Sequence, residues 1–296
     1  MAKAVAQTQT TKRKSRSQAA EIWRLLVRNK GAMVGMAITI FLVILACTVD
    51  VIFDYDAEII SQNLSERLQP PSSAHWFGTD NLGRDIFKRV AYGTKYSLLI
   101  GLVSTAIGSA IALVLGSIAG YFGGKVDITI MRFCDVFGAI PGLLMGMLVV
   151  AILGPDLINL MIAMGISAFP ATSRTVRAAV LTVRNSEYVE SARAIGIPEW
   201  KIIAKYIIPN CMSPIIVAVT LRVGGNIISA SSLSFLGLGA QAPMPEWGAM
   251  LSEGRGFVRG QPYITVFPGL AIMITVLALN MFGDGLRDAM DPKLRR

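Results

Sequence analysis

Charged side chains are scarce in this sequence, and histidine is nearly absent. Of the 296 residues, 16% are charged and one is histidine, whereas 53% are hydrophobic. An ordinary soluble domain has about 25% charged residues. This shortage of charge, with the hydrophobic residues gathered in long runs, is typical of a chain whose solvent is a lipid bilayer. The composition therefore disfavours a soluble globular protein.

The residue groups that metal sites and catalysis require are missing as well. His75 has no second histidine or cysteine near it for a metal site and supports no Ser/His/Asp arrangement. The cysteines (Cys47, Cys134 and Cys211) lie in or beside apolar runs, without metal-ligand or disulfide spacing, as small apolar side chains do. Gly123–Lys125 lacks the spacing and the hydroxyl of a phosphate-binding loop. We expect no enzyme activity, metal or cofactor in this chain, so any active transport must draw its energy from another chain or an ion gradient.

Apolar runs long enough to cross a bilayer core of about 30 Å at about 1.5 Å per residue dominate the rest of the chain. The runs cover residues 31–49, 96–122, 128–153, 157–172, 211–236 and 264–283. The fourth run is the shortest and ends beside Pro170. The sequence therefore predicts an all-α membrane protein of about six transmembrane helices, with a basic N-terminal tail over residues 1–30 and a transmembrane domain over residues 31–296.

The second run contains small residues at helical spacing, which let helix backbones approach closely in lipid. These residues are Gly101, Thr105, Gly108, Ser109, Ala112 and Gly116.

The net charge of +9 is concentrated in the loops and tails, which argues against a nucleic-acid partner. With six spans, the two termini share one side of the membrane. By these limits about 19 lysines and arginines fall on that side and about seven on the other, where acids roughly cancel them. The positive-inside rule therefore predicts that both termini are cytoplasmic.

The largest cytoplasmic loop, residues 173–210, has the pattern of two short helices. The first spans residues 187–195 and stops at Gly196, a residue suited to a left-handed C-terminal cap. The second begins at Pro198 and ends at Pro209. Its expected apolar stripe is Trp200, Ile203, Ala204 and Ile207. The residues alone leave two interpretations open, a docking site for a partner or a solvated amphipathic connector.

One stretch of this loop resembles the EAA loop of bacterial ABC import permeases, which reads E-A-A, three residues, G, nine residues, I-x-L-P. Glu190–Ala192, Gly196 and Tyr206 match its spacing, as do Ile208 and Pro209, with Ser, Tyr and Ile standing for Ala, Ile and Leu. In that family the loop couples the permease to an ATP-binding subunit. The resemblance assigns coupling to Glu187, Glu190, Ser191, Ala192, Arg193, Gly196 and Pro209.

Further stretches narrow the resemblance to the C-type permease of oligopeptide, dipeptide and nickel importers, over Ile22 to Pro292. They are Trp76–Asp85 with Tyr92-Gly93, Ser234–Gly239 with Pro243, Pro245 and Trp247-Gly248, and Asn280–Asp288 with Asp291-Pro292. This resemblance implies a type I ABC importer bundle in the bacterial inner (plasma) membrane, in contact with lipid. It implies a homologous second permease, an extracytoplasmic substrate-binding protein and two ATP-binding subunits that hold ATP and magnesium. The implied substrates are di- or oligopeptides, with nickel chelates, glutathione-like compounds or haem as variants.

Polar residues within the spans are candidates for the path of the substrate. The fifth run contains Thr220, Arg222, Asn226, Ser229 and Ser232. Tight packing against the partner permease would explain this polar face nearly as well. Arg132 and Asp135 in the third run lie three residues apart and can neutralise each other, which favours helix packing over substrate contact.

Rival functions make different demands on the sequence. A secondary transporter should have ionisable relays or broken helices at the bilayer centre and no docking loop. A scaffold or receptor would not need the polar fifth run, and an ABC exporter usually lacks the extended external segment. Copurification of an ATPase with this chain would separate the importer from all three.

The predicted topology can be tested with reporter fusions. A reporter after Arg296 should be cytoplasmic, and one inserted near Gln69 should be external, because the basic residues lie on the side of the termini. Phosphatase and fluorescent-protein activities measure the two locations. An external C-terminus would mean that the number of spans is wrong, first of all at residues 157–172.

Overall fold

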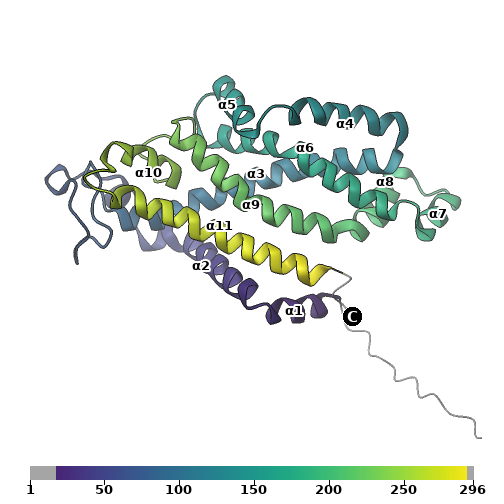
Figure 1. Ribbon diagram of the computed structural model, residues 1–296, viewed down its shortest axis with the longest axis horizontal. Helices are drawn as coiled ribbons and strands as arrows, with labels where there is room; N and C mark the ends of the chain where they lie inside the picture. The colour runs from purple at the N-terminus through teal and green to yellow at the C-terminus, as the bar shows by residue number, and fades with distance from the viewer. Residues whose placement is uncertain (1–17, 292–296) are drawn as a thin grey trace, which may run out of the picture.

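The computed structural model describes residues 18–291, so the N-terminal part of the basic tail and Pro292 of the closing motif lie outside the described residues. The described chain is an elongated bundle in which α2, α3, α6, α9 and α11 run lengthwise (Figure 1). The helices are α1 (Gln18–Arg28), α2 (Lys30–Ile52), α3 (Ile86–Phe122), α4 (Gly124–Gly138), α5 (Gly142–Leu153), α6 (Leu157–Val183), α7 (Glu187–Ala194), α8 (Glu199–Ile202), α9 (Met212–Phe235), α10 (Trp247–Gly254) and α11 (Tyr263–Met290). The all-α fold class is confirmed.

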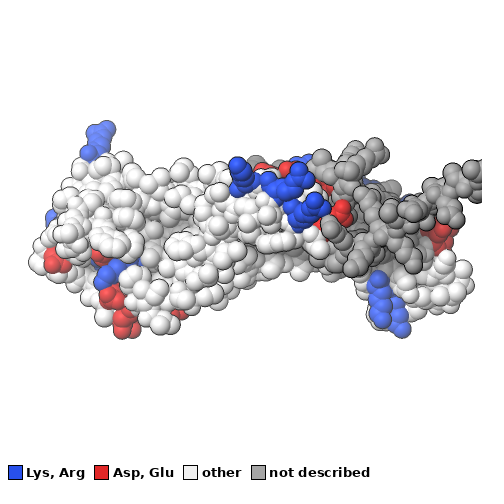
Figure 2. Space-filling model, turned by 90° about the horizontal axis from the view of Figure 1, so that it is seen from below, with Lys and Arg blue, Asp and Glu red and all other residues white. Residues whose placement is uncertain are grey.

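Four stretches of the described chain are long and apolar enough to cross a membrane: α2, α3, Glu199–Phe235 and α11. On the face seen in Figure 2, an uncharged belt lies between the charged side chains at the left end and a group of lysines and arginines near the middle of the view. Such a belt fits a hydrocarbon environment because charges at membrane depth are costly.

The third predicted run is not a straight helix. Helices α4 and α5 qualify as a span only together, and they meet at 83° across a break at Ala139–Pro141. Pro141 lacks an N–H group and cannot continue the hydrogen-bond ladder of α4. The fourth run was predicted to end beside Pro170, but α6 continues through that proline to Val183. Neighbouring helices and local adjustments allow prolines within membrane helices.

Helix α3 packs closely against α6 through the small residues that the sequence singles out. A Cβ atom on Gly108 would lie 2.8 Å from the carbonyl oxygen of Gly165, and one on Gly116 would lie 2.6 Å from that of Ser173. Both distances are too short for any side chain larger than hydrogen. The predicted close approach of helix backbones is confirmed at these positions.

A buried ionic network ties the segment before α3 to α10. The guanidinium of Arg84 donates to Asp80 at 2.6 Å and to Glu253 at 2.6 Å. Arg89, on the first turn of α3, donates to Glu253 at 3.2 Å. Both arginine side chains are 1% exposed, so their charges need these carboxylates. Asp80 and Arg84 of the motif at Trp76–Asp85 therefore fix the segment before α3 to the bundle.

Glu246 fixes the start of α10 from inside the protein. Its carboxylate is fully buried and accepts hydrogen bonds from the backbone N–H groups of Gly248 and Ala249, each at 2.9 Å. Burial raises the pKa of Glu246. The side chain is the N-cap of α10, which contacts α3, α9 and α11.

The last part of the segment expected as a basic tail forms α1. Leu26 of this helix is buried with Ala32 of α2 and Ala289 of α11. Trp23 and Val27 are exposed on its other side. Helix α1 is therefore attached to the bundle through its apolar face.

The α3–α6 contact can be tested with a single methyl group. Gly116→Ala should lower the free energy of unfolding by about 1–3 kcal/mol, because the new Cβ must displace the backbone at Ser173. The thermal midpoint of the purified protein in detergent measures the change. Gly260→Ala is the matched control, since no atom lies within 4 Å of its added Cβ. Equal midpoints for the two variants would contradict the inferred close packing.

Candidate coupling loop and translocation cavity

The predicted coupling loop protrudes from one end of the bundle. Helices α7 and α8 lie at the end opposite to α10 (Figure 1). The last turns of α6 lead directly into them, and the backbone N–H of Arg184 still donates to Val180 at 3.0 Å. The first helix of the loop was predicted over residues 187–195 and is α7, Glu187–Ala194.

Gly196 ends α7 in the left-handed conformation that its position predicts. Its φ is +77°, and a Cβ there would meet no atom within 4 Å. The N–H of Ile197 donates to the carbonyl of Ala192 at 3.1 Å, a bond typical of a glycine-capped helix end. The constraint at Gly196 is therefore conformational and not steric.

Pro209 does not end the second helix as predicted. A π-helical turn at Ile203–Ile207 and a 3-10 turn at Pro209–Cys211 join α8 to α9. The N–H of Ile208 donates to Ile203 at 2.9 Å, so the ladder shifts by one residue before the proline. The wider π-helical turn and the tighter 3-10 turn accommodate the missing N–H of Pro209, so the backbone remains helical from α8 to α9.

The loop has an inner face that packs against its own protein. Val189 and Ala192 of α7 are buried, as are Ile202 and Ile207, in one cluster with residues of α6 and α9. Ala192 is only 3% exposed. This small residue of the motif therefore makes contacts within the chain. The predicted apolar stripe is confirmed for Ile203 and Ile207 and wrong for Trp200 and Ala204, which are exposed.

The outer face of the loop, defined by Tyr188, Ile195 and Trp200, is apolar and exposed. Ile195 is 76% exposed and Trp200 is 66% exposed. Glu187, Glu190 and Ser191 are exposed on α7 as well. Exposed large apolar side chains at the tip of a loop are candidates for contact with another protein.

A contact at the end of α3 holds the loop in place. The hydroxyl of Tyr121 donates to Glu199, and Nε of Arg193 donates to the Tyr121 oxygen at 3.1 Å. The Arg193 guanidinium also lies 4.8 Å from the centre of the tyrosine ring. Arg193, predicted as a coupling residue, thus contacts α3. Tyr121 and Glu199 were missed because no local pattern signals a contact across 72 residues or more.

A cavity of about 320 Å³ lies between the α4–α5 break, α6 and α9. Arg222, Asn226 and Ser229, three of the predicted path residues, line it. Asn226 is held by a hydrogen bond from its Nδ2 to Thr105 Oγ1 of α3 at 2.9 Å. The structure therefore brings these three side chains to one hollow midway along α6 and α9.

The other two predicted path residues do not reach this cavity. The hydroxyl of Thr220 donates to its own helix at Ile216, 2.9 Å away, and that of Ser232 donates to Ile228 at 2.8 Å. Ser232 lines a separate hollow of about 410 Å³ beside α11. The polar face of α9 is thus divided between two environments.

Comparison with known proteins decides the family. Residues 112–296 match the family described as binding-protein-dependent transport system inner membrane component. Residues 17–71 match the N-terminal transmembrane domain of oligopeptide transport permease C. The chain belongs to this permease family. The resemblance to C-type permeases of ABC importers is confirmed.

Relatives of the permease cover nearly its whole length. It is 46% identical to a glutathione transport system permease protein of Pectobacterium atrosepticum, over 93% of this chain and 91% of the relative. It is 44% identical to a dipeptide transport system permease protein of Alkalihalophilus pseudofirmus, over 93% of this chain and 90% of the relative. A glutathione transport system permease protein of Escherichia coli is 48% identical, over 93% of this chain and 90% of the relative.

Solved structures support the fold. Two inward-facing crystal forms of the MetNI methionine ABC transporter match with TM-scores of 0.57 and 0.58. They cover 69% and 70% of the permease and 96% and 98% of the matched chains, at 18% and 19% identity. The type I importer bundle expected from the motifs is thus found among its structural neighbours.

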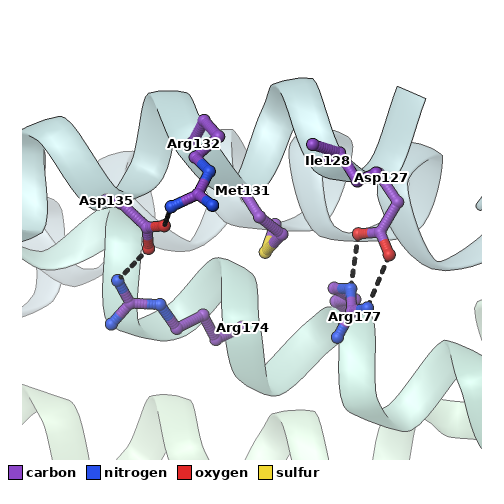
Figure 3. Close-up of a pocket in the computed structure, with 7 residues that line it drawn as sticks. All are labelled: Asp127, Ile128, Met131, Arg132, Asp135, Arg174 and Arg177. Carbon is purple, nitrogen blue, oxygen red and sulfur yellow. Dashed lines mark hydrogen bonds and ion pairs between the residues drawn. The ribbon is translucent and has the colours of Figure 1, made fainter. Parts of the chain in front are cut away.

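Charged side chains of the permease connect α4 to α6 around a hollow of about 470 Å³ (Figure 3). Arg177 forms a bidentate pair with Asp127, both contacts at 2.5 Å. Arg174 contacts Asp135 at 2.8 Å, whereas Arg132 contacts the same carboxylate at 3.8 Å. The predicted Arg132–Asp135 pair exists, but the nearer partner of Asp135 is on α6. The cluster therefore joins two helices, in line with a packing role.

The two faces of α7 can be separated by one substitution on each. Ala192→Glu should lower the free energy of unfolding of the permease by at least about 2 kcal/mol, because it buries a carboxylate without a partner. Ala194→Glu should have little effect on stability, because Ala194 is exposed. Thermal midpoints in detergent and the amount of protein in the membrane measure both. Equal stability of the two variants would mean that α7 does not pack as described.

Proposed function

We propose that this permease forms, with a homologous second permease, the path for di- or oligopeptides that an extracytoplasmic binding protein delivers. In this proposal, two partner subunits bind ATP and magnesium and supply the energy, and the permease itself catalyses no reaction. The outer face of the loop carries the proposal. An exposed apolar tip at the end opposite the external segment is a surface for a cytoplasmic subunit.

The substrate class rests on the relatives and stays a proposal for this chain. One relative is named for dipeptide transport and two are named for glutathione transport. Glutathione is itself a small peptide-like acid, and the names of these two relatives favour it as the alternative substrate. Nickel chelates and haem have no such support here.

The proposed topology has both termini in the cytoplasm of the bacterial inner membrane. Its support is the excess of lysine and arginine in the tails and in the loop that carries α7. In this orientation the outer face of the loop meets the ATP-binding subunits, and the network of Arg84, Arg89 and Glu253 faces outward. The exposed side chains of residues 53–85 would then be available to the binding protein.

Coupling is proposed to run from the outer face of the loop into the bundle by two routes. One is covalent, because α6 continues into the loop and lines the cavity in its middle. The other passes from Arg193 and Glu199 through Tyr121 to α3. A shift of α7 caused by closure of the ATP-binding subunits would therefore move α6, which lines the cavity, and α3, whose Thr105 holds Asn226 of the cavity lining. Glu187, Glu190 and Ser191 would make contact, whereas Ala192 and Arg193 would position α7.

The path of the substrate is proposed to include the cavity at the α4–α5 break. Irregular backbone at membrane depth is tolerated where it is buried in protein or lines a water-filled space. Arg222, Asn226 and Ser229 supply polar side chains at the same place. Thr220 and Ser232 remain candidates for contact nearer the two ends of α9.

Coupling can be tested at Gly196 with a matched pair of variants. Gly196→Val should strain the left-handed cap by about 1–2 kcal/mol and misorient the outer face, so uptake and stimulation of the ATPase by loaded binding protein should fall together. Gly196→Asn should retain most of both activities, because asparagine tolerates this conformation. Uptake in membrane vesicles and ATP hydrolysis by the purified complex measure the effect.

The amount of permease in the membrane is the control for Gly196→Val. It should stay near normal, because no atom lies within 4 Å of the added Cβ. Normal transport by Gly196→Val would mean that the loop is only a connector.

A further inference from the structure

Arg222 has no charge partner in the part of the permease that the structure describes. It lies near the middle of α9 and is half-buried. Within residues 18–291 its guanidinium makes no hydrogen bond or ion pair. An arginine at the depth of a membrane span is costly unless it faces water or an opposite charge. Its side chain lines the cavity at the α4–α5 break, so water or an opposite charge must reach it there.

The charged side chains that line the cavity are positive. Among residues 18–291 these are Arg174 and Arg222, and no aspartate or glutamate of that range lines it. Arg174 is already paired with Asp135 at 2.8 Å, which leaves Arg222 as the uncompensated charge. The remaining amide hydrogen of Asn226 and the hydroxyl of Ser229 can donate hydrogen bonds to a ligand. The hollow therefore favours a small anion with hydrogen-bonding capacity.

We propose that Arg222 binds the carboxylate of the substrate during its passage through the cavity. A guanidinium presents its N–H donors in a planar fork that matches a carboxylate with two parallel hydrogen bonds. Every short peptide with a free C-terminus carries such a group. A volume of about 320 Å³ is sufficient for the C-terminal end of a short peptide. The inference rests on the proposed function as a peptide permease. It names Arg222 as the residue that recognises the carboxylate of the substrate in the cavity.

An acid on the second permease is the other group that would neutralise Arg222. In that case the arginine would hold the two permeases together and would not distinguish one substrate from another. A peptide and its C-terminal amide differ only in the carboxylate, so the ratio of their uptake separates the two roles.

The experiment uses the complete transporter with its binding protein in proteoliposomes that contain ATP. Trialanine and trialanine amide are the probes, each at a concentration that saturates the binding protein as measured by calorimetry. Arg222→Gln should lower trialanine uptake about tenfold and leave trialanine amide uptake within about twofold, because only the acid loses a charge-assisted pair. Arg222→Lys should retain part of the wild-type preference, because it keeps the charge but loses the planar fork.

Arg132→Gln is the matched control, since it removes the same charge from an exposed side chain outside the cavity. It should keep the wild-type ratio of acid to amide. Because the ratio is taken within each variant, fewer assembled transporters would lower both rates and leave the ratio unchanged.

An unchanged ratio of acid to amide uptake in Arg222→Gln would overturn the inference. If both rates fell together, Arg222 would pair with the second permease. If neither rate fell, Arg222 would have no role in transport. A wild-type transporter that takes up neither probe would instead refute the proposed peptide substrate, and the inference with it.

Discussion

Close packing of α3 on α6 is the contact on which the rest of the permease depends. Lipid tails are as apolar as leucine, so helices in a bilayer associate through backbone proximity and polar contacts and not through burial of apolar area. Gly108 and Gly116 provide that proximity, because each places the backbone of α6 where any other residue would have a Cβ. With α3 and α6 fixed to each other, the loop at one end and the cavity in the middle acquire defined positions.

The α4–α5 break is held by polar contacts with the same α6. The hydroxyl of Ser167 donates to the carbonyl of Gly142 at 2.9 Å, where α5 begins. Toward the other end of α4, Asp127 and Arg177 form a bidentate pair. These contacts stabilise a bend that would otherwise leave backbone groups without partners. The cavity exists because α4 and α5 turn away from a straight path and leave room beside α9.

The coupling loop separates two tasks between the faces of one short helix. Val189 and Ala192 attach α7 to the core of the permease, and Tyr121 holds Arg193 from the end of α3. Ile195, beyond the end of α7, stays exposed. A rigidly attached helix can transmit a displacement, whereas a solvated connector would absorb it. In the proposed coupling, the internal contacts would therefore matter as much as the exposed ones.

The sequence by itself determined the helical membrane fold, the close approach along α3 and the left-handed cap at Gly196. These follow from composition, helical spacing or the conformational freedom of one residue, all of which are local properties. Only the tertiary structure decided that Ala192 faces inward and Trp200 outward, because both are compatible with an amphipathic helix until a neighbour is present. It also decided the pairing of Arg84 with Glu253 and of Arg193 with Tyr121, which lie 169 and 72 residues apart. Such contacts depend on how whole helices pack, and no short pattern in the chain records that arrangement.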